Sequence, residues 1–294
     1  MHADEVAIDA SLVRRLVAAQ FPGWAYLPVR PVPSSGTVNA MYRLGEDMVA
    51  RLPRLARYAG DVDRERRWLP RLAPRLPVAI PVPVARGEPG EGYPFPWSVY
   101  RWIGGENPAA GSLADASSLA GDLATFVAAM RRLDPADAPP ASFRGPLAAH
   151  DAPVREAIRE SRGLVDTKAA TAAWEAALRV PDWPGPPVWV HADLMPGNLL
   201  LADGRLAAVI DFSAAGLGDP AADTMVAWNL LPAGAREGFG SALRVDAATW
   251  SRGRGMALLK AFLALPYYRH TNPAFAANAR HTIQEVLADH ERGA

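Results

Sequence analysis

The chain contains no cysteine and almost no lysine. The absence of cysteine from its 294 residues excludes disulfide frameworks, thiolate metal sites and cysteine nucleophiles. Only Lys168 and Lys260 are lysines among the 31 basic residues, so the other 29 are arginines. Any chemistry that usually employs a lysine before residue 168 must therefore use a substitute.

Long apolar runs and an excess of one charge are also missing. The 31 basic and 31 acidic side chains balance, whereas a nucleic-acid binder normally carries a basic face. No charge-free stretch approaches the roughly 18 residues that suggest a membrane span, and the acidic start of the chain does not resemble an export signal. We therefore expect a soluble, cytoplasmic monomer or homodimer that binds neither nucleic acid nor membranes.

The first third of the chain has the sequence pattern of a small β-sheet. Short apolar runs separated by Gly and Pro predict five antiparallel strands, at residues 29–32, 41–44, 48–52, 82–85 and 97–101. Helical spacing predicts two helices, at residues 11–20 and 61–76. Asp9 should cap the first helix, and Pro70 and Pro74 should kink or end the second.

After residue 105 the pattern becomes mainly helical. Apolar spacing predicts six helices, at residues 113–133, 154–164, 167–178, 221–231, 247–265 and 273–290. Two short strands are predicted between them, at residues 188–190 and 206–210. The expected fold class is α+β and bilobal: a five-stranded N-terminal lobe with a helix (1–101), a hinge (102–106) and a larger, mainly helical C-terminal lobe (107–294).

The segment 190–200, Val-His-Ala-Asp-Leu-Met-Pro-Gly-Asn-Leu-Leu, carries the strongest chemical signal. An apolar strand leads to Asp193 and, through a loop made compact by Pro and Gly, to Asn198. Asp211 follows at the end of strand 206–210. We expect the two short strands to form a hairpin that brings these three side chains to one end of a small sheet. Two carboxylates and an amide oxygen suit a hard divalent cation, or leave one carboxylate without metal to orient a hydroxyl.

Three pieces of this region together resemble a family signature: His191-x-Asp193-x-x-x-x-Asn198, Ile210-Asp211-Phe212 and Gly218-Asp219-Pro220-x-x-Asp223. They are similar to the motifs of the aminoglycoside phosphotransferase family, small-molecule kinases with a protein-kinase-like fold. The resemblance implies that Asp193 accepts the proton of the acceptor hydroxyl. It also implies that Asn198 and Asp211 hold Mg²⁺ against the nucleotide phosphates, while His191 and Asp219 support the loop.

The resemblance also implies nucleotide contacts in the N-terminal lobe, at Ser35, Gly36, Thr37, Asn39, Arg51, Glu65, Tyr100 and Trp102. Residues 34–39 resemble the loop that covers the phosphates, although an ordinary hairpin turn would look the same. Arg51 stands where the family has its phosphate-binding lysine, with Glu65 as its ion-pair partner; the alternative is a surface ion pair without a catalytic role. Arginine offers a rigid bidentate fork where lysine offers a mobile point charge. The backbone groups of Tyr100 and Trp102 would pair with the base.

Two departures from the family pattern lie inside the catalytic motif. Ala192 occupies a position where glycine is usual, and Met195 one where many relatives have a polar residue. Neither change removes a group that accepts a proton or binds a metal, so the loop geometry is expected to survive.

The resemblance implies an enzyme that transfers the γ-phosphate of ATP or GTP, with Mg²⁺, to a hydroxyl of a small molecule, and an antibiotic is the favoured acceptor. Two alternatives stay open: a kinase of an endogenous metabolite, such as a sugar, an amino alcohol or a biosynthetic intermediate, and a catalytically silent nucleotide-binding module. The second is motivated by arginine in the lysine position. Five residues are candidates to line the acceptor pocket: Asp223, Trp228, Asn229, Tyr267 and Tyr268. Residues 191–294 carry 10 acidic and 9 basic side chains, which favours a less charged acceptor than a polycationic aminoglycoside.

Overall fold

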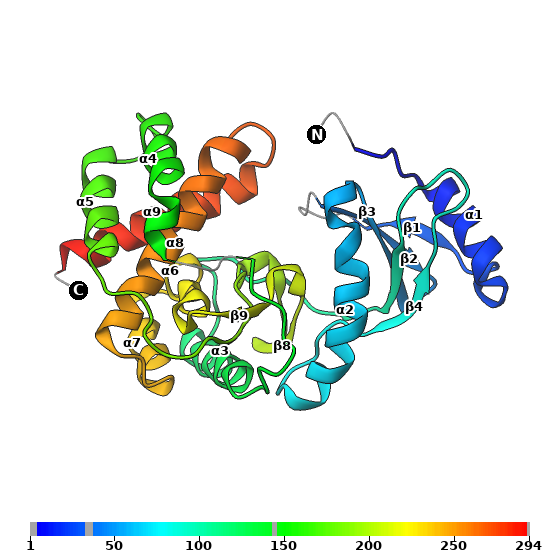
Figure 1. Ribbon diagram of the computed structural model, residues 1–294, viewed down its shortest axis with the longest axis horizontal. Coiled ribbons are helices and arrows are strands. Elements are labelled where there is room, and N and C mark those ends of the chain that lie inside the picture. The colour runs from blue at the N-terminus through cyan, green and yellow to red at the C-terminus, as the bar shows by residue number, and fades with distance from the viewer. Residues whose placement is uncertain (1–4, 33–37, 143–145, 293–294) are drawn as a thin grey trace. The chain divides into compact units, whose positions relative to one another are not determined.

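The protein divides into two compact units (Figure 1). The computed structural model describes residues 5–32, 38–142 and 146–292. The first unit comprises Met1–Arg75 and Ala79–Gly104, and the second Leu76–Val78 and Gly105–Ala294. Within the described ranges, no helix is long and apolar enough to cross a membrane.

The first unit contains the predicted five-stranded antiparallel sheet, in the order β1-β2-β3-β5-β4. Its strands are β1 (Val29–Pro31), β2 (Asn39–Leu44), β3 (Met48–Pro53), β4 (Pro83–Gly87) and β5 (Trp97–Arg101). Every predicted strand is confirmed, with boundaries that differ by at most two residues. Strands β3 and β5 consist largely of buried residues, as expected for strands that have a neighbour on each side.

A hydrophobic core forms between helix α1 (Ala10–Gln20) and this sheet. Leu16 from the helix and Leu44, Leu52 and Trp97 from the strands are completely buried in it. The predicted cap at Asp9 is confirmed, since its carboxylate accepts the N–H of Leu12 at 2.7 Å. Capping supplies a partner to an N–H that the first helical turn leaves unpaired.

Helix α2 (Ala59–Leu72) carries the buried Glu65 and ends two residues before Pro74. Pro70 does not end this helix, which continues to Leu72 and is followed by a 3₁₀ turn at Ala73–Arg75. Pro70 lacks the N–H that would bond the carbonyl four residues earlier, so it costs the helix one hydrogen bond without ending it.

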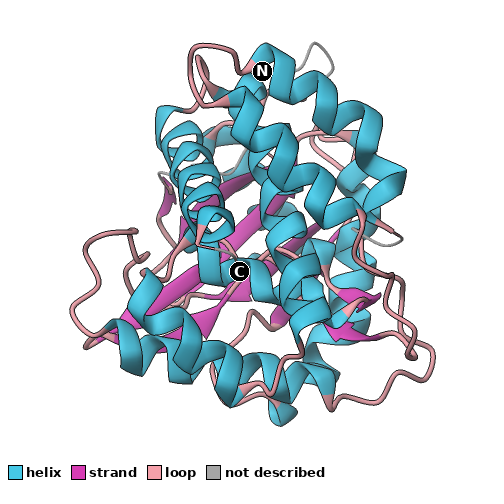
Figure 2. Ribbon diagram, turned by 90° about the vertical axis from the view of Figure 1, so that its left-hand side faces the viewer, coloured by secondary structure: helices cyan, strands magenta, loops and turns pink. Residues whose placement is uncertain are grey.

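The second unit is mainly helical, as Figure 2 shows from the side of α4, α5 and α9. Its helices are α3 (Ala116–Arg131), α4 (Asp151–Glu160), α5 (Thr167–Leu178), α6 (Val226–Asn229), α7 (Ala233–Ala242), α8 (Ala247–Tyr268) and α9 (Pro273–Glu291). The predicted helix 221–231 is wrong as a single α-helix, because Pro220–Met225 forms a 3₁₀ helix before α6 begins. Helix α7 was not predicted, since its three glycines give it low helix propensity.

Two small sheets hold the loops of the predicted catalytic motif. Strand β6 (Val188–Val190) pairs with β9 (Gly216–Gly218), and β7 (Leu199–Ala202) pairs with β8 (Arg205–Val209). The predicted hairpin between 188–190 and 206–210 is therefore wrong. The true partner of β8 is β7, joined to it by Asp203-Gly204, both at positive φ. An Asp-Gly pair with this geometry is the preferred two-residue hairpin turn.

Candidate active site

The loop from His191 to Asn198 joins β6 to β7, and a buried carboxylate accepts hydrogen bonds from its backbone. Asp223 is 0 % exposed, and its two oxygens accept the N–H groups of His191 at 2.9 Å and Ala192 at 2.8 Å. Ala192 itself has φ 61°, the left-handed conformation that glycine adopts more easily. Burial raises the pKa of Asp223, and the nearby His191 opposes that rise. The carboxylate thus replaces the hydrogen bonds that a sheet would otherwise give these two N–H groups.

The imidazole ring of His191 bridges the backbones of Ile210 and Asp193. Its Nε2 lies 3.1 Å from the carbonyl oxygen of Ile210, and its Nδ1 accepts the N–H of Asp193 at 3.3 Å. A carbonyl only accepts, so Nε2 carries the hydrogen and Nδ1 does not. Burial lowers the pKa of this histidine, which keeps the ring neutral and fits the assigned tautomer. These contacts connect the residue before Asp211 to the backbone of Asp193.

The carboxylate of Asp193 is held on both oxygens. Asn198 donates its Nδ2 to Oδ2 at 2.9 Å and to the backbone oxygen of Asp193 at 2.9 Å. Lys260, from the middle of α8, donates its Nζ to Oδ1 at 2.7 Å. The Asp193 side chain remains 30 % exposed, so a substrate can reach it. Sequence reasoning missed Lys260; its rarity as one of two lysines was the available signal.

Asn198 and Asp211 lie at the same end of the β7–β8 hairpin. The N–H of Ile210, the residue before Asp211, donates to the backbone oxygen of Asn198 at 2.8 Å. Because the Asn198 amide nitrogen is used by Asp193, its oxygen is the end suited to a cation. Asp211 is partly exposed and has φ 61°. Among the described residues no group of three or more His, Cys, Asp or Glu could hold a metal. The amide oxygen of Asn198 and the carboxylate of Asp211 are oxygen donors, the type that hard divalent cations take.

Asp219 begins the 3₁₀ helix that carries Asp223. Its carboxylate accepts the N–H of Ala221 at 2.8 Å and pairs with Arg252 from α8 at 2.7 Å. These contacts join Asp219 to α8, and its supporting role stays a prediction.

The predicted acceptor-lining residues occupy very different environments. Asp223 and Trp228 are 0 % exposed and Asn229 is 1 % exposed, so their side chains do not line an open pocket. Trp228 donates its Nε1 to Asp289, and Asn229 donates its Nδ2 to the carbonyl of Leu194. Of these three residues, Asp223 and Asn229 contact the backbone of the loop that carries Asp193. Tyr267 is 55 % exposed and Tyr268 partly buried against it at the end of α8.

In the first unit the structure brings Asn39, Arg51, Glu65 and Tyr100 together. Arg51 pairs with both oxygens of Glu65, at 2.6 and 2.7 Å. With its amide turned so that Oδ1 faces the guanidinium, Asn39 accepts from Nε and Nη2 of Arg51 at 3.0 and 2.9 Å. The Tyr100 hydroxyl donates to Glu65, whose side chain is only 3 % exposed. The guanidinium of Arg51 is therefore held in one orientation, and its side chain is only 14 % exposed.

Two predicted nucleotide contacts, at Trp102 and at residues 35–37, find no support in the described residues. The N–H of Trp102 donates to the carbonyl of Asp47 at 2.7 Å, so the sheet uses the group predicted to meet the base. The indole of Trp102 instead carries the guanidinium of Arg43 over its ring, 4.2 Å from the centroid. Ser35, Gly36 and Thr37 lie outside the described residues.

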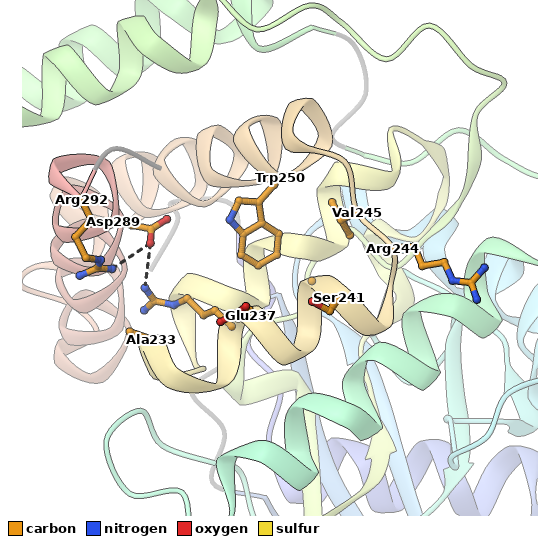
Figure 3. A pocket seen from close by; sticks show the side chains of 10 residues that line it. Ala233, Glu237, Ser241, Arg244, Val245, Trp250, Asp289 and Arg292 are labelled. Atoms are coloured by element: carbon orange, nitrogen blue, oxygen red, sulfur yellow. Dashed lines mark hydrogen bonds and ion pairs between the residues drawn. The ribbon is translucent and has the colours of Figure 1, made fainter.

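A surface pocket of about 410 Å³ lies among α7, α8 and α9 (Figure 3). None of the predicted site residues lines it. In its wall Asp289 pairs with Arg292 at 3.0 Å and with Arg236 at 4.0 Å.

Comparison with known proteins agrees with this arrangement. Residues 29–256 match the family described as "Phosphotransferase enzyme family" (APH). Among curated proteins, none is significantly similar to the chain. Aminoglycoside 2'-phosphotransferase-IIIa in its GDP complex superposes with a TM-score of 0.75 at 19% identity, covering 96% of this chain and 100% of that one. The GDP and kanamycin complex of APH(2")-IIia gives a TM-score of 0.74 at 20% identity, covering 94% and 98%. Macrolide 2'-phosphotransferase MphH from Brachybacterium faecium gives 0.60 at 23% identity, covering 94% and 97%. The fold is thus that of these phosphotransferases, and by its family match the chain belongs to the phosphotransferase enzyme family.

Proposed function

We propose that this protein is a kinase that transfers the γ-phosphate of ATP or GTP to a hydroxyl group of a small molecule. The observation that carries the proposal is the carboxylate of Asp193, which is fixed on both oxygens yet 30 % exposed. A general base must be oriented toward its substrate and still be reachable by it. Asn198 and Lys260 supply the orientation from two different elements.

Asp193 acts on the acceptor in this proposal. The acceptor oxygen forms a bond to the γ-phosphorus, the bond from that phosphorus to the β–γ bridging oxygen breaks, and Asp193 takes the hydroxyl proton. The Asn198 nitrogen holds Oδ2 in place during this transfer. His191 stays neutral and keeps the backbone of Asp193 at a set distance from Ile210.

Asn198 and Asp211 are the residues that would hold Mg²⁺, through an amide oxygen and a carboxylate. The ion, when bound, neutralises charge on the phosphates. In the first unit, Arg51 would contact a phosphate in place of the usual lysine, oriented by Glu65 and Asn39. Its Nη1, Nε and Nη2 groups already bond Glu65 and Asn39, so its contribution would be an oriented positive charge.

An antibiotic is the proposed acceptor class. The supporting observation is that the structures superposing on nearly the whole chain include a kanamycin complex and a macrolide phosphotransferase. A kinase of an endogenous metabolite would use the same catalytic groups, so only the acceptor distinguishes the two.

The test is a panel assay with Mg²⁺ and ATP or GTP in which the mass of each acceptor is measured. Aminoglycosides, macrolides, nucleoside and peptide antibiotics and common sugars form the panel. We expect one class to gain one phosphate, and Asp193→Asn to lower kcat by at least about 100-fold because general-base help is lost. Asp182→Asn, at an exposed loop position, is the matched control and should leave kcat unchanged. An Asp193→Asn variant with the wild-type rate would disprove the assignment.

A further inference from the structure

Lys260 places a positive charge directly beside the proposed base. Its Nζ lies 2.7 Å from Oδ1 of Asp193, and its side chain is 17 % exposed. The lysine reaches the loop from α8, 67 residues further along the chain. An acceptor whose hydroxyl approaches Asp193 therefore also approaches an ammonium group.

The use of lysine here stands out against the rest of the sequence. The chain has arginine at 29 of its 31 basic positions, and the other lysine, Lys168, is exposed on α5. The cavity beside Lys260 measures about 10 Å³, the size of one water molecule, and is lined by Met195, Asn229 and small side chains of α8 and α9. An ammonium is a compact point charge, whereas a guanidinium is a larger planar group.

The helices around this lysine supply no compensating negative charge. Residues 247–284, which make up α8 and most of α9, contain no Asp or Glu. Their basic residues are Arg252, Arg254, Lys260, Arg269 and Arg280. The first two pair with Asp219 and Asp289, and the last two are exposed.

Of the three acidic residues that follow, Glu285 and Asp289 are already engaged, and Glu291 is exposed at the end of α9. Glu285 pairs with Arg236, and Asp289 pairs with Arg292 and Arg254. Both lie in the part of α9 beyond residue 284, where Asp289 lines the pocket drawn in Figure 3. A site for a polycation would need carboxylates without such partners along its wall.

We propose that the charge of Lys260 makes the acceptor site select neutral or anionic acceptors and reject polycations. The inference rests on the proposed function, because it takes Asp193 as the residue that meets the acceptor hydroxyl. Lys260 neutralises the carboxylate of Asp193, which a polycation could otherwise bind. It also repels each further ammonium group of such a molecule.

The test compares the binding of kanamycin to the wild type, Lys260→Gln and Lys168→Gln by isothermal titration calorimetry at low salt. The two variants lose the same charge, one at the site and one on an exposed helix. A unit charge about 10 Å away changes affinity roughly tenfold at an effective dielectric constant of about 20. We expect Lys260→Gln to bind kanamycin at least about fivefold more tightly than the wild type, Lys168→Gln to match the wild type, and the gain to shrink at about 1 M salt.

Equal affinity of the wild type and Lys260→Gln, including no binding by either, would overturn the proposal. A second measurement on the wild type alone guards against a variant that does not fold. In the acceptor panel, kcat/KM should be higher for an uncharged acceptor than for kanamycin, and the reverse order would also overturn it. Failure of the proposed function would appear separately, as no phosphate transfer to any acceptor, because the calorimetric measurement requires no turnover.

Discussion

Replacing Asp223 by alanine should lower the free energy of unfolding by about 3 kcal/mol, because two buried N–H groups lose their acceptor. The carboxylate accepts from His191 and Ala192 at 2.9 and 2.8 Å and is completely buried. Each buried donor left without a partner costs about 1–3 kcal/mol. The sum, about 2–6 kcal/mol, is reduced because the variant no longer buries a carboxylate.

Asp223→Asn separates the hydrogen bonds from the charge. The amide keeps one oxygen for one N–H, but its NH₂ group faces the other, so we expect a loss of about 1–3 kcal/mol. The expected order of stability is therefore wild type, Asn variant, Ala variant. Asp182→Ala, at an exposed loop position, serves as the control and should change the free energy of unfolding by less than about 0.5 kcal/mol.

The assay is urea unfolding followed by circular dichroism, with the slope m compared among all four proteins. An Ala variant within about 0.5 kcal/mol of the wild type would refute the reasoning. An Asn variant more stable than the wild type would also refute it, since burial of the carboxylate would then cost more than its two hydrogen bonds contribute.

Two further predictions concern residues of the same loop. Burial lowers the pKa of His191, so below pH 6.5 the folded protein binds fewer protons than the unfolded chain and loses stability as the pH falls, by up to about 1.4 kcal/mol per pH unit. Urea unfolding between pH 5 and 7.5 should show that the free energy of unfolding changes less steeply with pH in His191→Asn than in the wild type. An equal dependence on pH in the two proteins would contradict the prediction. Ala192→Val should lower the free energy of unfolding by about 2–4 kcal/mol, because a branched side chain is strained at φ 61° and the site is buried. Ala192→Gly should change it by less than about 1 kcal/mol, since relief of strain offsets the lost methyl burial; equal effects of valine and glycine would contradict both.

Local signals in the sequence predicted the parts of the fold that local interactions determine. Helix α5 was predicted with its observed boundaries, because Asp166 caps an alanine-rich run. The motif at Asp193 and Asn198 also predicted that these side chains lie together, and they are joined by a hydrogen bond.

Contacts between distant segments could not be predicted in this way. Lys260 meets Asp193 across 67 residues, and nothing in the apolar spacing of α8 distinguishes it. The pairing of β6 with β9 depends on three-residue strands, one of which is Gly-Leu-Gly. Such short strands have almost no β propensity of their own and form because neighbouring elements hold them.

The nesting of the β7–β8 hairpin inside the β6–β9 pair has a consequence for folding. All four strands lie between residues 188 and 218, so each ladder closes a short loop. Once the hairpin has formed, the ends of β6 and β9 are brought close without further ordering of a long chain. Contacts of low sequence separation are reached quickly. The segment that carries Asp193, Asn198 and Asp211 can therefore assemble early as one unit. The contact of Lys260 with Asp193 forms when α8 packs onto this unit.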